Sequence, residues 1–133
     1  MKRKIIEQME AYFGRDQKRI NHARRVLGHA EEILKTEAGD REVVEAAAVL
    51  HDIGIHAAEK KHGSTAGKFQ EIEGPPIAEN ILQKIGFSEN KLAEVLQIIA
   101  HHHRPGIINT VNFKIIYEAD CLVNKEDNDN AAY

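Results

Sequence analysis

Histidine is frequent and unevenly placed in this sequence. Eight of the 133 residues are histidine, and they fall at positions 22, 29, 51, 56, 62 and 101–103. Histidine is the commonest metal ligand in proteins and titrates near neutral pH, so clustered histidines are typical of metal binding or acid–base chemistry. Surface histidines are also common, so the count alone leaves the role of each one open.

Three segments place histidine or aspartate in an apolar setting. His51 and Asp52 end an apolar stretch, Asp120 lies among apolar residues near the end of the chain, and His22 lies at the edge of an apolar stripe. An unpaired carboxylate in such a setting would cost several kcal/mol. A divalent cation bound by two imidazoles and two carboxylates would stabilise all of these groups together. The pattern therefore predicts a metal site made by these four residues.

Each of these residues also has a simpler interpretation when it is taken alone. His22 fits a partly exposed helix position, and the 51–52 pair fits a helix C-terminus, where a protonated imidazole is favourable and a carboxylate is not. Asp120 could instead form an ion pair with Lys125 or Arg104. The metal site is the interpretation that accounts for all of them at once.

The segments that must position these residues have helical periodicity and no pattern typical of strands. Asp16 is expected to cap a long helix that runs to about Thr36, with apolar residues at helical spacing. A second helix from about Arg41 is apolar nearly all round, which predicts a central position in the domain. Gly39-Asp40 separates these two helices, and Gly54 is expected to end the second.

The following part of the chain is expected to contain one loop and three helices. Residues 56–74 are polar and contain three glycines, which predicts an irregular loop, and Pro75-Pro76 is expected to begin the third helix. Ser88 is expected to cap a fourth helix that leads directly into the triple histidine at 101–103. A final helix is expected from about Val111.

These elements predict an all-α protein, a bundle of five to seven helices that forms a single domain over residues 1–133 with a central metal site. The larger helix counts include a short extra helix over residues 2–13. Residues 125–133 are expected to form a frayed tail. A hydrophobic content of 42% supports one apolar core and is too high for a disordered chain.

Charge and composition exclude several classes of protein. The net charge of −3 provides no general attraction for nucleic-acid polymers or acidic membranes. No apolar run approaches the length that spans a membrane, and the basic start of the chain is not followed by the apolar stretch of a secretory signal. The single cysteine, Cys121, excludes an intramolecular disulfide. We therefore expect a cytoplasmic protein without membrane contacts, and the composition is compatible with a homo-oligomer.

Four segments match a known series of motifs in the same order. They are HARRV at 22–26, AAAVLHDIG at 46–54, IIAHH at 98–102 and IIYEADCL at 115–122. The set resembles the motifs of the HD-domain superfamily of metal-dependent phosphohydrolases. It spans residues 22–123, most of the chain, and an ordered set is much more specific than a His-Asp dipeptide.

The resemblance implies an HD-domain-like helical bundle in which one divalent cation is bound by His22, His51, Asp52 and Asp120. The expected metals are Fe, Mn, Co, Ni or Mg. Some members of the superfamily bind a second metal through further histidines, with the aspartate of the pair bridging. Here His102, and after it His101, are the candidates for that role. One site is expected and a second is left open.

Two departures from the binuclear pattern bear on that second metal. The sequence has Glu73 in the segment where those members place a histidine before the third helix, and Ile55 where many carry lysine. Glu73 could replace the missing ligand, could act as a general base, or could be a favourable anion near a helix N-terminus.

The resemblance and the residues together predict hydrolysis of a small phosphorylated substrate by a metal-activated water. Asp52 or Glu73 would accept the proton from that water. Arg25, Lys61 and His62 are the expected substrate-binding residues, although the loop charges also fit solvated surface positions. The substrate is expected to be a nucleotide or a related small molecule, and either a phosphomonoester or a phosphodiester fits.

Two other functions are compatible with the sequence. One is a non-catalytic nucleotide-binding or signalling module that retains the same helical fold. The other is a protein in which the metal is purely structural. Turnover of a phosphoester separates the first from an enzyme, and chelation that abolishes activity but not folding excludes the second.

Overall fold

The structure of this chain is a computed structural model that describes the backbone of residues 1–131 and the side chains of residues 1–129. Within these residues the chain forms helices and connecting turns, without strands. Seven helices follow one another: α1 Lys2–Phe13, α2 Gln17–Ile33, α3 Arg41–Leu50, α4 Ile55–His62, α5 Gly67–Lys84, α6 Glu89–His101 and α7 Val111–Ala131. The expectation of an all-α fold is confirmed.

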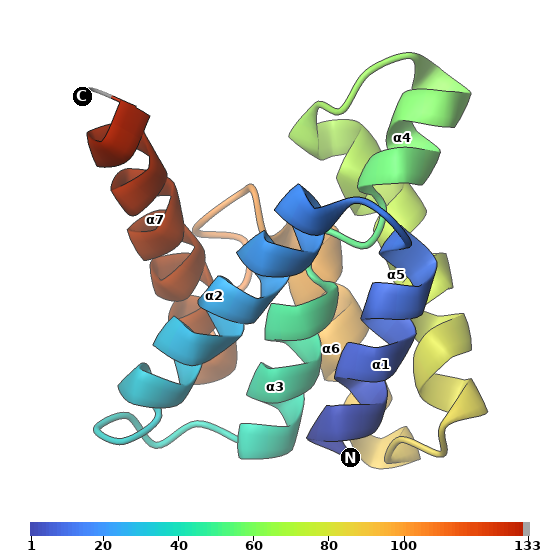
Figure 1. The fold of residues 1–133 in the computed structure, drawn as a ribbon. Coiled ribbons are helices and arrows are strands. Elements are labelled where there is room, and N and C mark those ends of the chain that lie inside the picture. The colour runs from blue at the N-terminus through green and yellow to red at the C-terminus, as the bar shows by residue number, and fades with distance from the viewer. Residues whose placement is uncertain (132–133) are drawn as a thin grey trace.

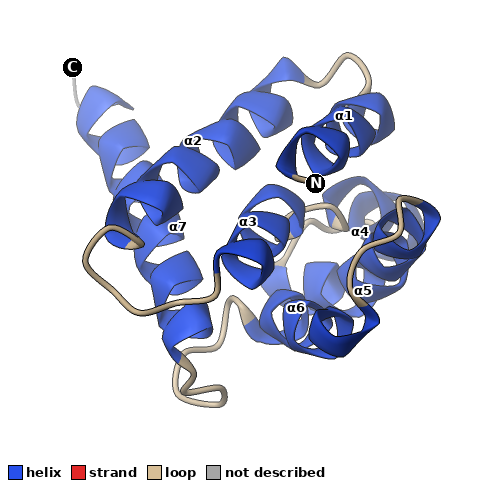
Figure 2. Ribbon diagram, turned by 90° about the horizontal axis from the view of Figure 1, so that it is seen from below, coloured by secondary structure: helices blue, strands red, loops and turns tan. Residues whose placement is uncertain are grey.

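Helix α3 lies at the centre of the bundle. It packs against α1, α2, α6 and α7, and Figure 2 shows it between the α2–α7 pair on one side and α5 and α6 on the other. Asp40 begins the helix by accepting a hydrogen bond from the backbone N–H of Val43. Three small residues, Ala46 to Ala48, are fully buried and allow neighbouring helices to approach closely. The central position predicted from its all-round apolar pattern is confirmed.

Helices α2 and α7 lie side by side although they are far apart in the sequence (Figure 1). The side chain of Asp16 caps α2 by accepting from the backbone N–H of Arg19. The short extra helix expected over 2–13 is confirmed as α1, which buries Ile5, Met9 and Phe13 at helical spacing. The described residues contain no helix that combines the length and the apolar character needed to cross a membrane.

The prediction of an irregular loop over 56–74 is wrong. Two helices, α4 and α5, occupy most of this segment, and Pro75 and Pro76 lie inside α5 rather than at its start. A single glycine in the left-handed conformation, Gly63, ends α4. Gly74 does not break α5 because it packs against Gly54, and this packing outweighs the local cost of glycine and proline in a helix.

The C-terminal end of the chain also differs from expectation. Helix α7 continues to Ala131, so the frayed tail expected from residue 125 is wrong for the part that the structure describes, and residues 132–133 lie outside it. Contacts with α2 explain the extra turns of helix. Arg25 donates to both Glu126 and Asp127, and His29 lies 3.1 Å from Glu126.

Candidate metal centre

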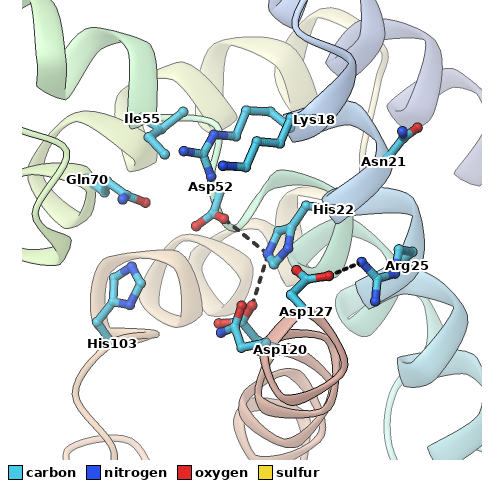
Figure 3. Close-up of a pocket in the computed structure, with 12 residues that line it drawn as sticks. Lys18, Asn21, His22, Arg25, Asp52, Ile55, Gln70, His103, Asp120 and Asp127 are labelled. Carbon is cyan, nitrogen blue, oxygen red and sulfur yellow. Dashed lines mark hydrogen bonds and ion pairs between the residues drawn. The ribbon is translucent and has the colours of Figure 1, made fainter. Parts of the chain in front are cut away.

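His22 is the contribution of α2 to a cluster at the centre of the molecule. Its Nε2 lies 3.0 Å from Asp120 Oδ1, 3.3 Å from Asp52 Oδ2 and 3.3 Å from His51 Nε2. Figure 3 shows the ring between the two carboxylates. The simpler interpretation of His22, as a partly exposed helix residue, does not explain these three contacts, which come from two other segments of the chain.

His51 and Asp52 follow directly on the last residue of α3. The imidazole of His51 is fully buried, and its Nδ1 donates to the backbone carbonyl of Ala48 at 2.7 Å. A carbonyl can only accept, so this contact places a proton on Nδ1 and directs Nε2 toward the cluster. A backbone contact of this kind orients many metal-binding histidines.

Asp120 completes the cluster from α7. Its Oδ1 lies 3.0 Å from His22 and 3.4 Å from His51, with no contact to the alternative partners Lys125 and Arg104. The four residues singled out from the sequence therefore meet in one place, although α2 and α7 contribute residues 98 positions apart.

The spacing and the chemistry of these donors fit a divalent metal ion. Bonds of about 2.1 Å to one ion place adjacent ligand atoms roughly 3.0–3.4 Å apart in octahedral or tetrahedral geometry. The donor atoms of His22, His51, Asp52 and Asp120 are separated by 3.0–3.4 Å along their close contacts. Three of these residues, His22, His51 and Asp52, also form a group whose ligand atoms all lie within 4.8 Å of one another.

The charges in the cluster stabilise one another. Burial alone would raise the pKa values of Asp52 and Asp120, yet both pKa values are lowered: Asp52 by His51 and His102, and Asp120 by hydrogen bonds with His22 and His51. Burial likewise opposes the charged form of His51, but the two carboxylates raise the pKa of this imidazole well above its usual value. The cluster therefore keeps both carboxylates ionised and holds positive charge between them.

The triple histidine at the end of α6 divides into three different environments. His102 is buried: its Nδ1 donates to the carbonyl of Ile99 at 2.7 Å, and its Nε2 lies 3.2 Å from Asp52 Oδ1. His103 lies next to it, and together with Asp52 and His102 it forms a second group that could hold a metal ion. Burial, followed by the charge of His102, lowers the pKa of His103.

His101 turns away from this group. Its Nδ1 accepts a hydrogen bond from Arg104, and it lines a separate surface depression. The structure thus brings His102 and His103 to the centre and leaves His101 outside. The buried carboxylate of Glu71 fixes the end of α6, since it accepts from the backbone N–H of His103 and from the side chain of Arg104.

A pocket of about 550 Å³ opens onto the cluster. Its walls include His22, Asp52 and Asp120, and also His103 and Ile55, two positions that the sequence had already brought into question. They further include residues that the sequence did not indicate as site residues: Lys18, Arg19, Asn21, Gln70, Asn124 and Asp127. Lys18 and Arg19 lie in the first turn of α2, directly after the Asp16 cap, and this turn contains no acidic residue. Two cations at a helix N-terminus were the feature of the sequence that could have indicated them. Nothing in the sequence pattern marked Gln70.

The structure distributes the predicted substrate-binding residues unevenly. Arg25 lines the pocket, but its guanidinium is paired with Asp127 at 2.6 Å and Glu126 at 2.9 Å. Lys61 and His62 are not among the residues that line the pocket. Both bind the carboxylate of Glu73, at 3.0 and 2.9 Å.

Glu73 is likewise outside the cluster. It lines a different depression, with Tyr12, His56 and Lys61 among its neighbours, and hydrogen bonds from His62 and then Lys61 lower the pKa of its carboxyl. The residue of α5 that lines the pocket at the cluster is Gln70, one turn before Glu73.

Gln70 has an unusual hydrogen-bonding state. The residue is 7% exposed, and its side-chain Nε2 donates to the carbonyl of Thr65 at 2.6 Å. The opposite atom, Oε1, is buried and has no hydrogen-bond partner among the described residues. A buried acceptor without a partner costs about 1–3 kcal/mol, so this atom calls for an explanation.

The fold and the centre define a class of protein: a helical bundle with a buried histidine–aspartate cluster that could hold a divalent metal. The family model for the HD domain matches residues 19–125, so the chain belongs to the HD domain family. This membership confirms the resemblance seen in the sequence.

A solved structure gives the same result. A predicted HD superfamily hydrolase from an uncultured Thermotogales bacterium is 30% identical in sequence to this chain, and its crystal structure superposes on this one with a TM-score of 0.70. The match covers 90% of this chain and 66% of the other, so this chain corresponds to slightly under two thirds of that protein. A comparison with curated proteins gave no match.

Proposed function

We propose that this protein is a metal-dependent phosphohydrolase that cleaves a phosphate ester of a small molecule, such as a nucleotide or a related compound. The observation that carries this proposal is the convergence of His22, His51, Asp52 and Asp120 from three parts of the chain. Family membership and the relation to a protein described as a hydrolase support it. Fe, Mn, Co, Ni and Mg are the proposed metals, with one ion expected and a second compatible with the group around His102.

A divalent cation held by these residues would supply Lewis acidity, lowering the pKa of a water molecule and polarising a phosphoryl oxygen. Asp52 is suited to accept a proton at this place because its two oxygens have different surroundings. Oδ2 lies 3.3 Å from both His22 and His51, whereas Oδ1 is directed to His102 at 3.2 Å. We propose Asp52 for this role in preference to Glu73, which is engaged by Lys61 and His62.

The surroundings of Asp52 also favour proton movement toward and away from the site. His102 lies on the side of Oδ1, and His103 lies on the same side within the pocket wall. Two imidazoles next to a carboxylate form a short route for a proton to leave toward solvent. Asp52 would thus orient the water, accept a proton from it and pass that proton to His102.

Phosphate release by metal-loaded protein tests the proposal. The wild-type protein, loaded separately with Mn²⁺, Fe²⁺, Co²⁺, Ni²⁺ and Mg²⁺, is assayed on 4-nitrophenyl phosphate, bis-4-nitrophenyl phosphate and a panel of nucleotides. We expect turnover with at least one metal, and a loss of at least about 100-fold in kcat for Asp52→Ala. Asp129→Ala, a change at an exposed position on α7, is the control and should keep full activity.

Two results would contradict the proposal. Unchanged activity in Asp52→Ala would remove Asp52 from the reaction. Metal-loaded protein that binds nucleotides but hydrolyses none of the panel would favour the non-catalytic binding module instead.

A further inference from the structure

The pocket wall on the α2 side carries two cations, in a pocket that Asp52, Asp120 and Asp127 also line. Lys18 and Arg19 both line the pocket, and neither side chain forms an ion pair within the described part of the chain. In Figure 3, Lys18 extends across the pocket toward the side where Asp52 lies. The third cation of the pocket, Arg25, is already neutralised by Glu126 and Asp127.

The location of these two cations adds the dipole of a helix to their own charge. They lie in the first turn of α2, where the helix dipole is positive and acidic residues are normally preferred. The carboxylate that caps this helix, Asp16, is already engaged by the backbone N–H of Arg19 and by His56 at 2.7 Å. An anion inside the pocket would meet both side chains and the positive end of the helix.

Gln70 is an independent sign of a ligand on the opposite wall, which α5 forms. Because the Thr65 carbonyl can only accept, the nitrogen of the amide must face it, and Oε1 is the opposite end of the amide in a residue that lines the pocket. The close-up shows the amide of Gln70 facing the space beside Asp52. An acceptor held there without a partner is suited to a donor that a ligand brings, and the broad terminal torsion of glutamine allows the small adjustment needed to uncover it.

We propose that the pocket selects phosphate esters whose organic part carries a hydroxyl group. Lys18 and Arg19 bind the phosphoryl oxygens, and Gln70 Oε1 accepts a hydrogen bond from the hydroxyl. This inference rests on the proposed function and adds a substrate class to it. Gln70 is then a specificity-determining residue, because its contact is made by the organic part of the substrate and not by the phosphate.

A pair of matched ligands tests this selection. Binding of glycerol 1-phosphate and of propyl phosphate to the metal-loaded protein is measured by calorimetry, because the two differ in their hydroxyl groups alone. The wild-type protein should bind glycerol 1-phosphate about tenfold more tightly, the effect of one well-placed hydrogen bond to a buried acceptor. Equal affinities in the wild-type protein would overturn the proposal, and this comparison depends on no variant.

Variants then assign the two roles. Gln70→Met, similar in length but without the acceptor, should lose the tenfold preference while its affinity for propyl phosphate stays the same. Lys18→Gln and Arg19→Gln should each weaken both ligands several-fold without changing the preference. Arg15→Gln is the control, because Arg15 is a nearby cation that does not line the pocket. A preference that persists in Gln70→Met, or affinities unchanged in Lys18→Gln and Arg19→Gln, would contradict the assignment.

The binding readout separates this inference from the proposed function. Selective binding that depends on Gln70, in a protein that hydrolyses neither these two esters nor any member of the panel above, would support the ligand class and contradict the hydrolase. Hydrolysis of both esters at equal rates and affinities would support the hydrolase and overturn the selection.

Discussion

At the scale of single residues, the centre depends on side chains whose orientation is fixed by backbone contacts. His51 and His102 each donate from Nδ1 to the carbonyl three residues earlier, at 2.7 Å in both cases. This repeated contact leaves Nε2 of both rings directed toward Asp52. The same local geometry at the ends of α3 and α6 therefore prepares two imidazoles on opposite sides of one carboxylate.

Glu71 holds the second of these helix ends in place. It is buried and accepts from the backbone N–H of His103 and from Arg104 through its two oxygens, so a glutamine in its place would turn an NH2 group toward one of these donors. We predict that Glu71→Gln lowers the free energy of unfolding by about 1–3 kcal/mol, measured by urea denaturation. Glu79→Gln, an exposed position on the same helix, should change it by less than about 0.5 kcal/mol. Equal stability of the two variants would contradict this role of Glu71.

The sequence was informative for residues that combine a distinctive type with a distinctive setting. His22, His51, Asp52 and Asp120 stood out because imidazoles and carboxylates lay on apolar faces, and the structure brings all four together. Gln70 could not be found in this way. A glutamine is ordinary in a helix, and its importance arises from Thr65 and the pocket, which are contacts made by the folded chain.

At the scale of elements, two contacts decide how the helices that carry the centre are placed. The first is the cap of α2. Asp16 accepts from the backbone of Arg19 and from His56 on α4, so one carboxylate both begins a helix and joins it to another. The hydrogen bond with His56 is the largest influence on this carboxyl, and it lowers the pKa of Asp16.

The sign of the pH dependence follows from this lowered pKa. The unfolded carboxyl titrates near about 3.9, and the folded one titrates lower, so the contribution of Asp16 to stability is present above about pH 4 and is lost as the pH falls through the folded pKa. Asp16→Asn retains a capping side chain but no charge. We predict that it is less stable than the wild type at pH 5 and that the difference shrinks toward pH 3 in urea denaturation. A difference that stays constant between these two pH values would contradict the prediction.

The second contact is the approach of Gly54, after α3, to Gly74 within α5. A Cβ on Gly54 would lie 2.5 Å from the backbone nitrogen of Gly74 and 2.8 Å from the carbonyl of Gln70. Backbone atoms at such distances cannot give way cheaply, so Gly54→Ala must push α5 and its Gln70 away from the pocket. We predict a loss of at least about 2 kcal/mol in the free energy of unfolding.

Gly28→Ala is the matched control for that change. Nothing lies within 4 Å of a Cβ at Gly28, in the middle of α2, and alanine is the better helix former by about 1 kcal/mol. The same substitution should therefore stabilise the protein at this position, measured by thermal unfolding. Similar melting temperatures for the two variants would show that the approach of Gly54 to Gly74 is not tight.

The same contact explains why the helices around it were the least predictable elements. Residues 56–74 contain polar residues and three glycines, and local preference correctly indicated a break at Gly63. It gave the wrong result at Gly74 and Pro75, where packing between helices decides the conformation. Helices α2 and α3 were predicted better, because their apolar periodicity expresses the same burial that stabilises them.

At the scale of the whole molecule, the centre is formed by parts of the chain that are remote in sequence. His22 and Asp120 are 98 residues apart and meet because α2 and α7 pack along each other. Periodicity alone could not give this pairing, since it predicts which face of a helix is buried and not its neighbour. The ordered resemblance to a known family supplied that information, and the family match over 19–125 confirms the family.

The measurement that tests this account most directly is the metal content of purified, metal-loaded protein, determined by elemental analysis for the wild type, His22→Ala and His29→Ala. His29 lies on the same helix as His22 but pairs with Glu126 at 3.1 Å instead of with the cluster. We predict at least about one divalent ion per chain in the wild type and in His29→Ala, and a loss of most of it in His22→Ala with helicity by circular dichroism unchanged. Equal metal content in the two variants, or no metal in the wild type after loading, would contradict the central claim that these helices meet around a divalent ion.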